Sequence, residues 1–513
     1  MDGRNNILTA AEIALTEKAV GMALDAGAQK CRMTLSKSVL DLAGTLNGEL
    51  DKVTHCLDRS LSIVLLVDGR YGSFSTNRLE EEALLDFIRD AVETVRTLTV
   101  DPCRDLPLPE RVARDAVRGD ETKTYDPESY EALTPETLVE EALAAAVYGK
   151  ASLPEGVSMI SEEGELSVTI SDSLLLDSQG TRCRCLDTLF EYGVEVTIEA
   201  AGEKVSGYWW DSSPWRKCLD AGACGTTAVR KAVEALGGTA LPSGKYRMAV
   251  STECASKLVT PLLNALGGFA LQQKNSFLTD SLGKALFPER LTILDQPRVP
   301  GTNGARFYDS EGVATENVPV IDRGVVSRYF LNTYIAAKMG LSPTVEDAMR
   351  PLVVPTLPGV TLKQWCASVS GAMGSGELRS LRSLRPLPLP TSSSPCDNSY
   401  PAGPYPCPGV DMSPSPTAPL HSSTPCPQPE VSTTIIVEGF NGGNNNPATG
   451  AFSYGIEGRA LMPDGSIVPV KEMLITGNFL TLWAGLVDVL DDARPCNPKS
   501  LPSLVFDGVD FSG

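Results

Sequence analysis

The stretch from Gly439 to Gly458, GFNGGNNNPATGAFSYGIEG, carries the strongest fold signal in this 513-residue chain. Gly442 and Gly443 tolerate positive φ and three asparagines follow them, so we expect a glycine-rich turn over residues 439–450. The residues after Gly450 alternate between apolar and polar, which is the period of a half-buried strand. MPDG at residues 462–465 then predicts a hairpin turn into a further strand.

Six other motifs follow a fixed order along the chain. They are SGYWWDSS (206–213), LPSGKYRMAVSTE (241–253), NSFLTDSLG (275–283), FYDSEGVAT (307–315), ITGNF (475–479) and PSLVFDGVDFSG (502–513). Together with the glycine-rich stretch, this series resembles the TldD/PmbA family of metallopeptidases (peptidase family U62), and specifically its PmbA (TldE) branch. The resemblance covers nearly the whole chain outside residues 366–432.

Element patterns predict an α+β protein of two domains. Residues 1–240 mix helical periods with groups of strands, so we expect an N-terminal α+β domain. Residues 241–513 are dominated by strand and turn patterns, so we expect a mostly β, barrel-like domain. Within it, residues 386–429 are rich in Pro, Ser and Cys and predict a disordered insertion, because such a segment buries too little apolar surface to offset its ordering.

Helical periods predict four helices in the first half of the chain. They are expected at residues 10–27, 79–98, 135–148 and 217–236. The clearest is the second, in which Leu84, Ile88, Val92 and Val95 form one apolar stripe.

The net charge of −20 at pH 7 argues against a nucleic-acid partner, because phosphate binding needs clustered Lys and Arg. The family's older description as a modulator of DNA gyrase suggests a DNA partner, which this composition does not support. The N-terminus lacks the pattern of a signal peptide, and no apolar run is long enough to cross a membrane. We therefore expect a cytoplasmic protein with no membrane partner. Thirteen scattered cysteines fit reduced thiols better than a disulfide framework.

The resemblance implies a zinc site in the catalytic members of the family, where an H-E-x-x-x-H helix supplies two imidazoles and a general base. In this chain the corresponding helix is expected at residues 253–265, and the motif falls on Thr260, Pro261 and Ala265. None of these side chains can hold a divalent metal or act as a base. We therefore expect no catalytic residue and no metal site here, and zinc in a partner subunit.

Other candidates for chemistry are few. The chain has two histidines, His55 on an expected strand and His421 in the insertion, and neither is expected to bind a metal. Cys496 lies where the resemblance implies a cysteine ligand in the catalytic branch, but without imidazoles it is interpreted as a plain thiol. Cys183 and Cys185 share one strand face, which is weak evidence for a metal site. A Ser/His/Asp triad is nearly excluded by the shortage of histidines, whereas Ser-Lys or carboxylate chemistry stays open.

Tyr208, Trp209, Trp210 and Trp215 form an aromatic cluster in the sequence. One interpretation is packing between the two domains. The other is an interface or the wall of a peptide groove, since Trp and Tyr are favoured anchors.

Two hypotheses of function follow. By resemblance, the chain is the non-catalytic TldE-like subunit of a TldD/TldE-type peptidase that degrades or matures peptides, with a TldD-like catalytic partner and a peptide or unfolded polypeptide as substrate. Gly442, Gly443, Asn444 and Asn445 are its expected substrate-binding residues, because a peptide can approach them closely and add as a strand. If Gly442 and Gly443 line a shared cavity, Gly443→Val is expected to reduce cleavage while the chain stays soluble and binds its partner. If they only form a tight turn, the substitution should instead unfold the second domain and abolish partner binding together with activity. The alternative is a stand-alone, non-enzymatic binding or regulatory protein, for which a homodimer is one arrangement.

Overall fold

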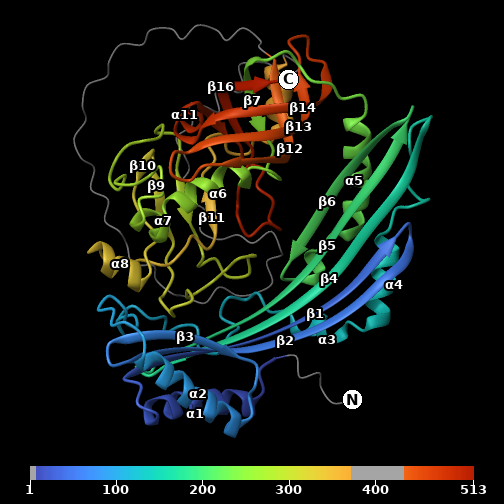
Figure 1. The fold of residues 1–513 in the computed structure, drawn as a ribbon. Coiled ribbons are helices and arrows are strands. Elements are labelled where there is room, and N and C mark those ends of the chain that lie inside the picture. The colour runs from blue at the N-terminus through green and yellow to red at the C-terminus, as the bar shows by residue number, and fades with distance from the viewer. Residues whose placement is uncertain (1–6, 371–432) are drawn as a thin grey trace.

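The computed structural model describes residues 7–370 and 433–513. The expected insertion at residues 386–429 therefore lies outside the described residues, as does His421. The described chain forms a long curved sheet with helices on one face, followed by a closed barrel with its own small sheet (Figure 1). The predicted α+β class with a barrel-like second half is confirmed.

The N-terminal half is built on one antiparallel sheet of six strands in the order β3-β2-β1-β4-β5-β6. Its strands are β1 (Lys30–Leu46), β2 (Glu49–Val67), β3 (Arg70–Thr76), β4 (Val157–Asp177), β5 (Arg182–Ala200) and β6 (Glu203–Ser213). Burial alternates residue by residue along β1, β4 and β5, as expected of strands that have only one face packed. The two faces of this sheet therefore differ in chemistry.

Helices cover one face of this sheet. They are α1 (Ala10–Asp25), α2 (Glu81–Arg96), α3 (Pro127–Ala132), α4 (Pro135–Ala145) and α5 (Ala221–Ala235), with a 3₁₀ turn at Arg216–Cys218 before α5. Thr9 caps α1 in a capping box with Glu12. The apolar stripe predicted for residues 79–98 is confirmed, because all four of its residues are buried on α2. These helices pack on one face of the sheet, and α5 also borders the barrel, where its Glu234 pairs with Arg459 of β13 (Figure 1). The other face is free to line a space.

The barrel contains the glycine-rich stretch. Its strands are β7 (Gly244–Val250), β12 (Thr434–Asn445), β13 (Ala451–Leu461), β14 (Ile467–Asn478), β15 (Leu486–Val489) and β16 (Leu504–Ser512). Their order is β14-β13-β12-β7-β16-β15, and a further pairing of β14 with β16 closes the ring. The hairpin predicted at MPDG is confirmed, because residues 462–466 turn between β13 and β14. The expected domain boundary at 240/241 falls between α5 and β7.

The remaining elements pack beside the barrel. A small sheet has the order β10-β9-β8-β11, from β8 (Ile293–Asp295), β9 (Val318–Asp322), β10 (Val325–Val326) and β11 (Pro351–Val353). In the described part of this half the helices are α6 (Ser256–Ala265), α7 (Gly268–Gln272), α8 (Thr333–Met339), α9 (Leu362–Val369) and α11 (Phe479–Ala484). One large hydrophobic core joins α6, the small sheet and the barrel strands.

Nine cysteines of the described chain are free thiols, whereas Cys218 is disulfide-bonded. The expectation of reduced cysteines is therefore wrong at Cys218. Among the described helices, none is long and apolar enough to cross a membrane.

Candidate substrate groove at the barrel edge

An open strand edge borders a groove on the barrel. β13 pairs with β12 along its length, but β7 pairs only with residues Thr434–Val437 on the other side. In the described part of the chain, residues 438–445 of β12 thus have no strand on that side, and α6 lies beside them. The groove between them has a volume of about 440 Å³. Its lining is Glu253, Cys254, Ser256, Lys257, Thr260, Pro261, Phe440, Gly443, Asn444, Asn445 and Tyr454.

Three of the four residues predicted to bind substrate, Gly443, Asn444 and Asn445, line this groove, and Gly442 precedes them on the same strand. The local structure differs from the expectation. Instead of one turn over residues 439–450, β12 continues to Asn445, and only residues 446–450 turn. Two bulges in the β12–β13 pairing account for the difference, because a bulge accommodates glycines at positive φ within a strand.

The two adjacent glycines have different surroundings. Both have positive φ, 102° at Gly442 and 92° at Gly443. A Cβ on Gly442 would meet nothing within 4 Å, whereas one on Gly443 would lie 2.1 Å from the carbonyl oxygen of Ser453 on β13. Gly443 thus allows the close approach of β12 and β13, which favours the alternative in which Gly443→Val disturbs the fold.

Three aromatic rings of β12 and β13 pack together beside the groove. Tyr454 is buried and stacks on Phe452 at 5.5 Å, and Phe440 meets its ring edge-on at 5.6 Å. The ammonium group of Lys257 on α6 lies 4.8 Å from the centre of the Tyr454 ring. This cation–π contact joins α6 to the barrel wall across the groove.

The α6 wall does not fit a zinc ion. Thr260 and Pro261 offer no imidazole or carboxylate, and Ala265 is buried in the core. Moreover, the Lys499 ammonium donates a hydrogen bond to the Thr260 hydroxyl at 2.8 Å. Burial lowers the pKa of Lys499. The amino group of Lys499 therefore lies next to Thr260, where the resemblance implies a zinc ligand in the catalytic members of the family.

Two further polar side chains in the groove were not found from the sequence. One carboxylate oxygen of Glu253 is buried and has no hydrogen-bond partner among the described residues, while the other lies 3.8 Å from the Lys231 ammonium on α5. Burial raises the pKa of Cys254 to about 12, so this thiol stays protonated at neutral pH. Only the fold brings these residues to the β12 edge, because they are about 190 residues away from it in sequence.

The other sequence candidates lie in separate places. His55 is exposed on β2, with its Nδ1 2.7 Å from an Asp41 carboxylate oxygen. Cys183 and Cys185 are both buried, which confirms that they share a face of β5, and burial raises the pKa of each to about 12. Burial also raises the pKa of Cys496 to about 11.

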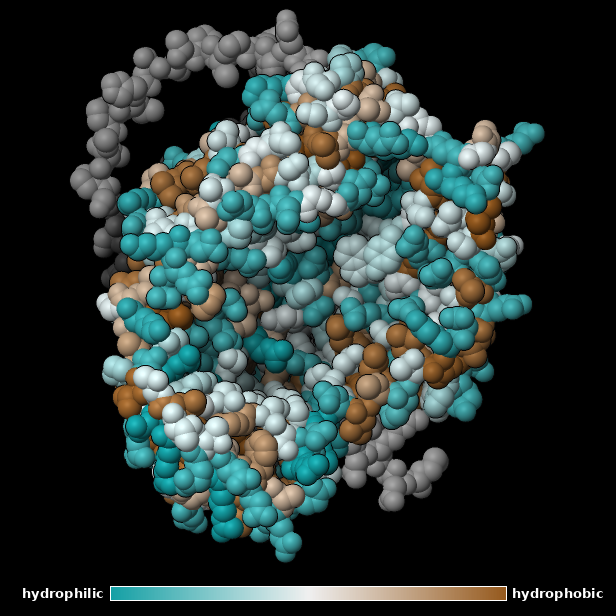
Figure 2. Space-filling view, in the orientation of Figure 1, coloured by the Kyte–Doolittle hydropathy of each residue, from teal (hydrophilic) through white to brown (hydrophobic). Residues whose placement is uncertain are grey.

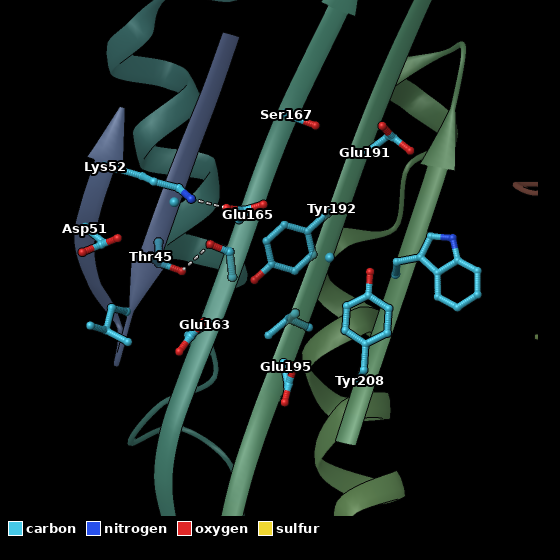
Figure 3. A pocket seen from close by; sticks show the side chains of 16 residues that line it. Thr45, Asp51, Lys52, Glu163, Glu165, Ser167, Glu191, Tyr192, Glu195 and Tyr208 are labelled. Atoms are coloured by element: carbon cyan, nitrogen blue, oxygen red, sulfur yellow. Dashed lines mark hydrogen bonds and ion pairs between the residues drawn. The ribbon is translucent and has the colours of Figure 1, made fainter. Parts of the chain in front are cut away.

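A second hollow lies on the helix-free face of the long sheet (Figure 3). It has a volume of about 580 Å³ and is lined by residues of β1, β2, β4, β5 and β6. Four glutamates, Glu163, Glu165, Glu191 and Glu195, line it beside the ring of Tyr208. Burial raises the pKa of Glu191. Figure 2 shows the molecule hollowed between the sheet and the barrel.

The structure confirms the first interpretation of the Tyr208–Trp215 cluster, packing between the two halves, while the second, a peptide groove or interface, stays a prediction. The Arg494 guanidinium, from the segment between β15 and β16, lies 4.2 Å from the Trp209 ring centre and 4.4 Å from that of Trp210. It also donates to the Trp210 carbonyl oxygen. Tyr208 stacks on Trp210 at 5.8 Å, is 51% exposed, and lines the sheet hollow. The cluster thus joins the two halves of the chain, and its Tyr208 and Trp210 also line the hollow on the long sheet.

Comparison with known proteins places this architecture in one family. Three family models match: the PmbA/TldA metallopeptidase C-terminal domain at residues 243–370 and 417–513, the central domain at 101–236, and domain 1 at 43–95. Although two models divide the N-terminal half, a single sheet runs through both regions.

Individual relatives agree with these matches. Metalloprotease PmbA of Escherichia coli O157:H7 is 27% identical over 334 residues, which cover 64% of this chain and 72% of the relative. A Bacteroides thetaiotaomicron protein, solved as a candidate modulator of DNA gyrase, superposes with a TM-score of 0.81 at 32% identity, over 98% of this chain and 99% of its own. TldE from Thermococcus kodakarensis shares the fold with a TM-score of 0.73 at 16% identity, over 97% and 100%. The chain therefore belongs to the PmbA/TldD family of metallopeptidases, and its similarity to PmbA proteins is consistent with the PmbA/TldE branch.

Proposed function

We propose that this chain is the zinc-free subunit of a cytoplasmic TldD/TldE-type metallopeptidase, and that it holds a peptide for a TldD-like partner that carries the zinc. The observation that carries the proposal is the α6 wall of the groove. At the position where the resemblance implies zinc ligands, Thr260 accepts a hydrogen bond from the Lys499 ammonium. The groove is nevertheless open and about 440 Å³ in volume.

The open edge of β12 suits a peptide in extended conformation. A strand that adds to a sheet edge gains backbone hydrogen bonds that do not depend on its sequence, as a peptidase with many substrates requires. Gly443 adds no side chain, and the exposed Asn444 supplies amide groups at the edge. Phe440 and the Lys257 stem offer apolar contact for substrate side chains.

The test is reconstitution. The full chain is co-expressed with the TldD-type subunit of the same organism, and the purified complex is assayed for peptide cleavage and zinc content. We expect cleavage only by the pair, with zinc assigned to the partner when each chain is analysed separately. No co-purification and no cleavage would favour the stand-alone binding protein, and tightly bound zinc in this chain alone would overturn the proposal.

A groove-filling variant tests the binding site itself. Ser256 lines the groove at the start of α6, so Ser256→Trp should fill the space beside β12 and raise the KM for peptides at least about tenfold, equivalent to 1.4 kcal/mol. Ser73→Trp, at an exposed position on β3, is the matched control. Unchanged KM for Ser256→Trp in a folded, partner-bound complex would remove this groove from the substrate path.

A further inference from the structure

Two positive charges beside the β12 groove have no counter-ion. The Lys257 ammonium lies 4.8 Å from the centre of the Tyr454 ring, and the Lys499 ammonium donates its hydrogen bond to the Thr260 hydroxyl. Within the part of the chain that the structure describes, neither ammonium group forms an ion pair with a carboxylate. In a chain with a net charge of −20, two unpaired lysines at one groove indicate that the groove takes an anionic group.

The Thr260 hydroxyl can donate a further hydrogen bond. Its oxygen accepts from Lys499, whereas its proton has no acceptor among the described residues. Thr260 and Lys257 are three residues apart on α6, so they lie on the same face of the helix, and both line the groove. An ammonium group and a hydroxyl proton on one face can together hold the oxygens of a carboxylate.

The acidic side chain of the groove does not neutralise these lysines. Among the described residues that line the groove, Glu253 carries the one carboxylate, and it lies 3.8 Å from the Lys231 ammonium on α5. Both of these side chains are more than four-fifths buried, so solvent and salt screen the pair little. Glu253 is therefore balanced by Lys231, and Lys257 and Lys499 leave this part of the groove positive.

We propose that the groove binds the C-terminal carboxylate of a peptide between the Lys257 ammonium and the Thr260 hydroxyl, with Lys499 behind Thr260. This inference rests on the proposed function, because it takes a peptide paired with the open edge of β12 as the occupant. Every unmodified peptide has a terminal carboxylate, whereas acidic side chains depend on the sequence, so the terminus suits sequence-tolerant binding. The substrate class is peptides with a free C-terminus, rather than internal segments of a long chain.

A pair of peptides tests this inference in the complex reconstituted with the TldD-type subunit. The two have the same sequence, contain no Asp or Glu, and end either in a free carboxylate or in an amide. We expect the KM for the free acid to be lower at least about tenfold. Equal KM values would overturn the inference and leave the proposed function standing, whereas no cleavage of either peptide would overturn both.

Variants assign the preference to this groove. Lys257→Met removes the charge from an unbranched side chain, and Thr260→Val removes the hydroxyl, so each should raise the KM for the free acid toward that for the amide. An unchanged KM for the amide, measured on the same preparation, shows that the variant is folded. The matched control is Lys338→Met on α8, whose ammonium also lies over a ring, 4.7 Å from the centre of Tyr334, but outside the groove. It should keep the full preference.

A third peptide separates the chain terminus from an acidic side chain. It ends in an amide and has one glutamate as its penultimate residue. We expect its KM to stay close to that of the plain amide, because the glutamate carboxylate is not at the chain end. A KM equal to that of the free acid would overturn the inference, as would a preference for the free acid that persists in both Lys257→Met and Thr260→Val.

Discussion

Single residues in the groove have different roles even when they are neighbours. An alanine at Gly442 carries only the strain of positive φ, about 1–2 kcal/mol. An alanine at Gly443 adds an overlap with the Ser453 carbonyl oxygen, so β13 must move. We therefore expect Gly443→Ala to lower the free energy of unfolding clearly more than Gly442→Ala in urea denaturation. Equal losses would show that the bulge adapts to a Cβ.

A buried carboxyl of the FYDSEGVAT motif makes stability depend on pH. Burial, together with the nearby Glu346 carboxylate, raises the pKa of Asp309 to about 7. In the unfolded chain the pKa of an Asp carboxyl is about 3.9. Between about pH 4 and pH 7 the folded state binds a proton at Asp309 that the unfolded state has released, so protonation favours the folded state. This contribution to the free energy of unfolding is complete below about pH 4 and is lost as the pH rises through about 7. Asp309→Asn keeps an oxygen to accept from the backbone N–H groups of Glu311 and Val313. Its melting temperature should therefore vary less between pH 4 and 7 than that of the wild type; parallel profiles would contradict this.

At the scale of elements, the packing of α5 on the sheet depends on a glycine. A Cβ on Gly207 of β6 would lie 2.2 Å from the carbonyl oxygen of Ala228 on α5. Gly207→Ala should push the helix off the strand and cost about 1–3 kcal/mol, read as a lower melting temperature. The control is Gly222→Ala within α5, where the nearest atom is 3.8 Å away and the change should be neutral or stabilising. A neutral Gly207→Ala would mean that the helix shifts without loss.

At the scale of the molecule, Arg494 links the barrel half to the long sheet. Its guanidinium packs on the rings of Trp209 and Trp210, and Ser212 donates to the Cys496 carbonyl oxygen nearby. Arg494→Met should loosen this junction, destabilise the chain by about 1–2 kcal/mol, and increase acrylamide quenching of tryptophan fluorescence. Arg89→Met, on the exposed side of α2, should change neither quantity. Unaltered quenching in Arg494→Met would place the junction elsewhere.

Several elements could be predicted because their signals are local. The stripe of α2, the alternation after Gly450 and the MPDG hairpin each depend on residues within one or two turns of each other, and the structure confirms all three. The candidate site was predicted only in part. Gly443, Asn444 and Asn445 line the groove, but its opposite wall, with Lys257 and Glu253, was not found.

The amino-acid sequence by itself determined the family, the α+β class and the absence of imidazoles at Thr260 and Pro261, since these depend on residue identity and short-range periodicity. Only the tertiary structure decided how the barrel closes and where the groove opens. Closure requires β7 to pair in parallel with β12, joining Arg247 to Thr434. That pairing ends at Val437, and within the described chain the edge of β12 beyond it lies open beside α6. Short-range sequence patterns could not show either feature, because both depend on contacts between residues that are far apart in the chain.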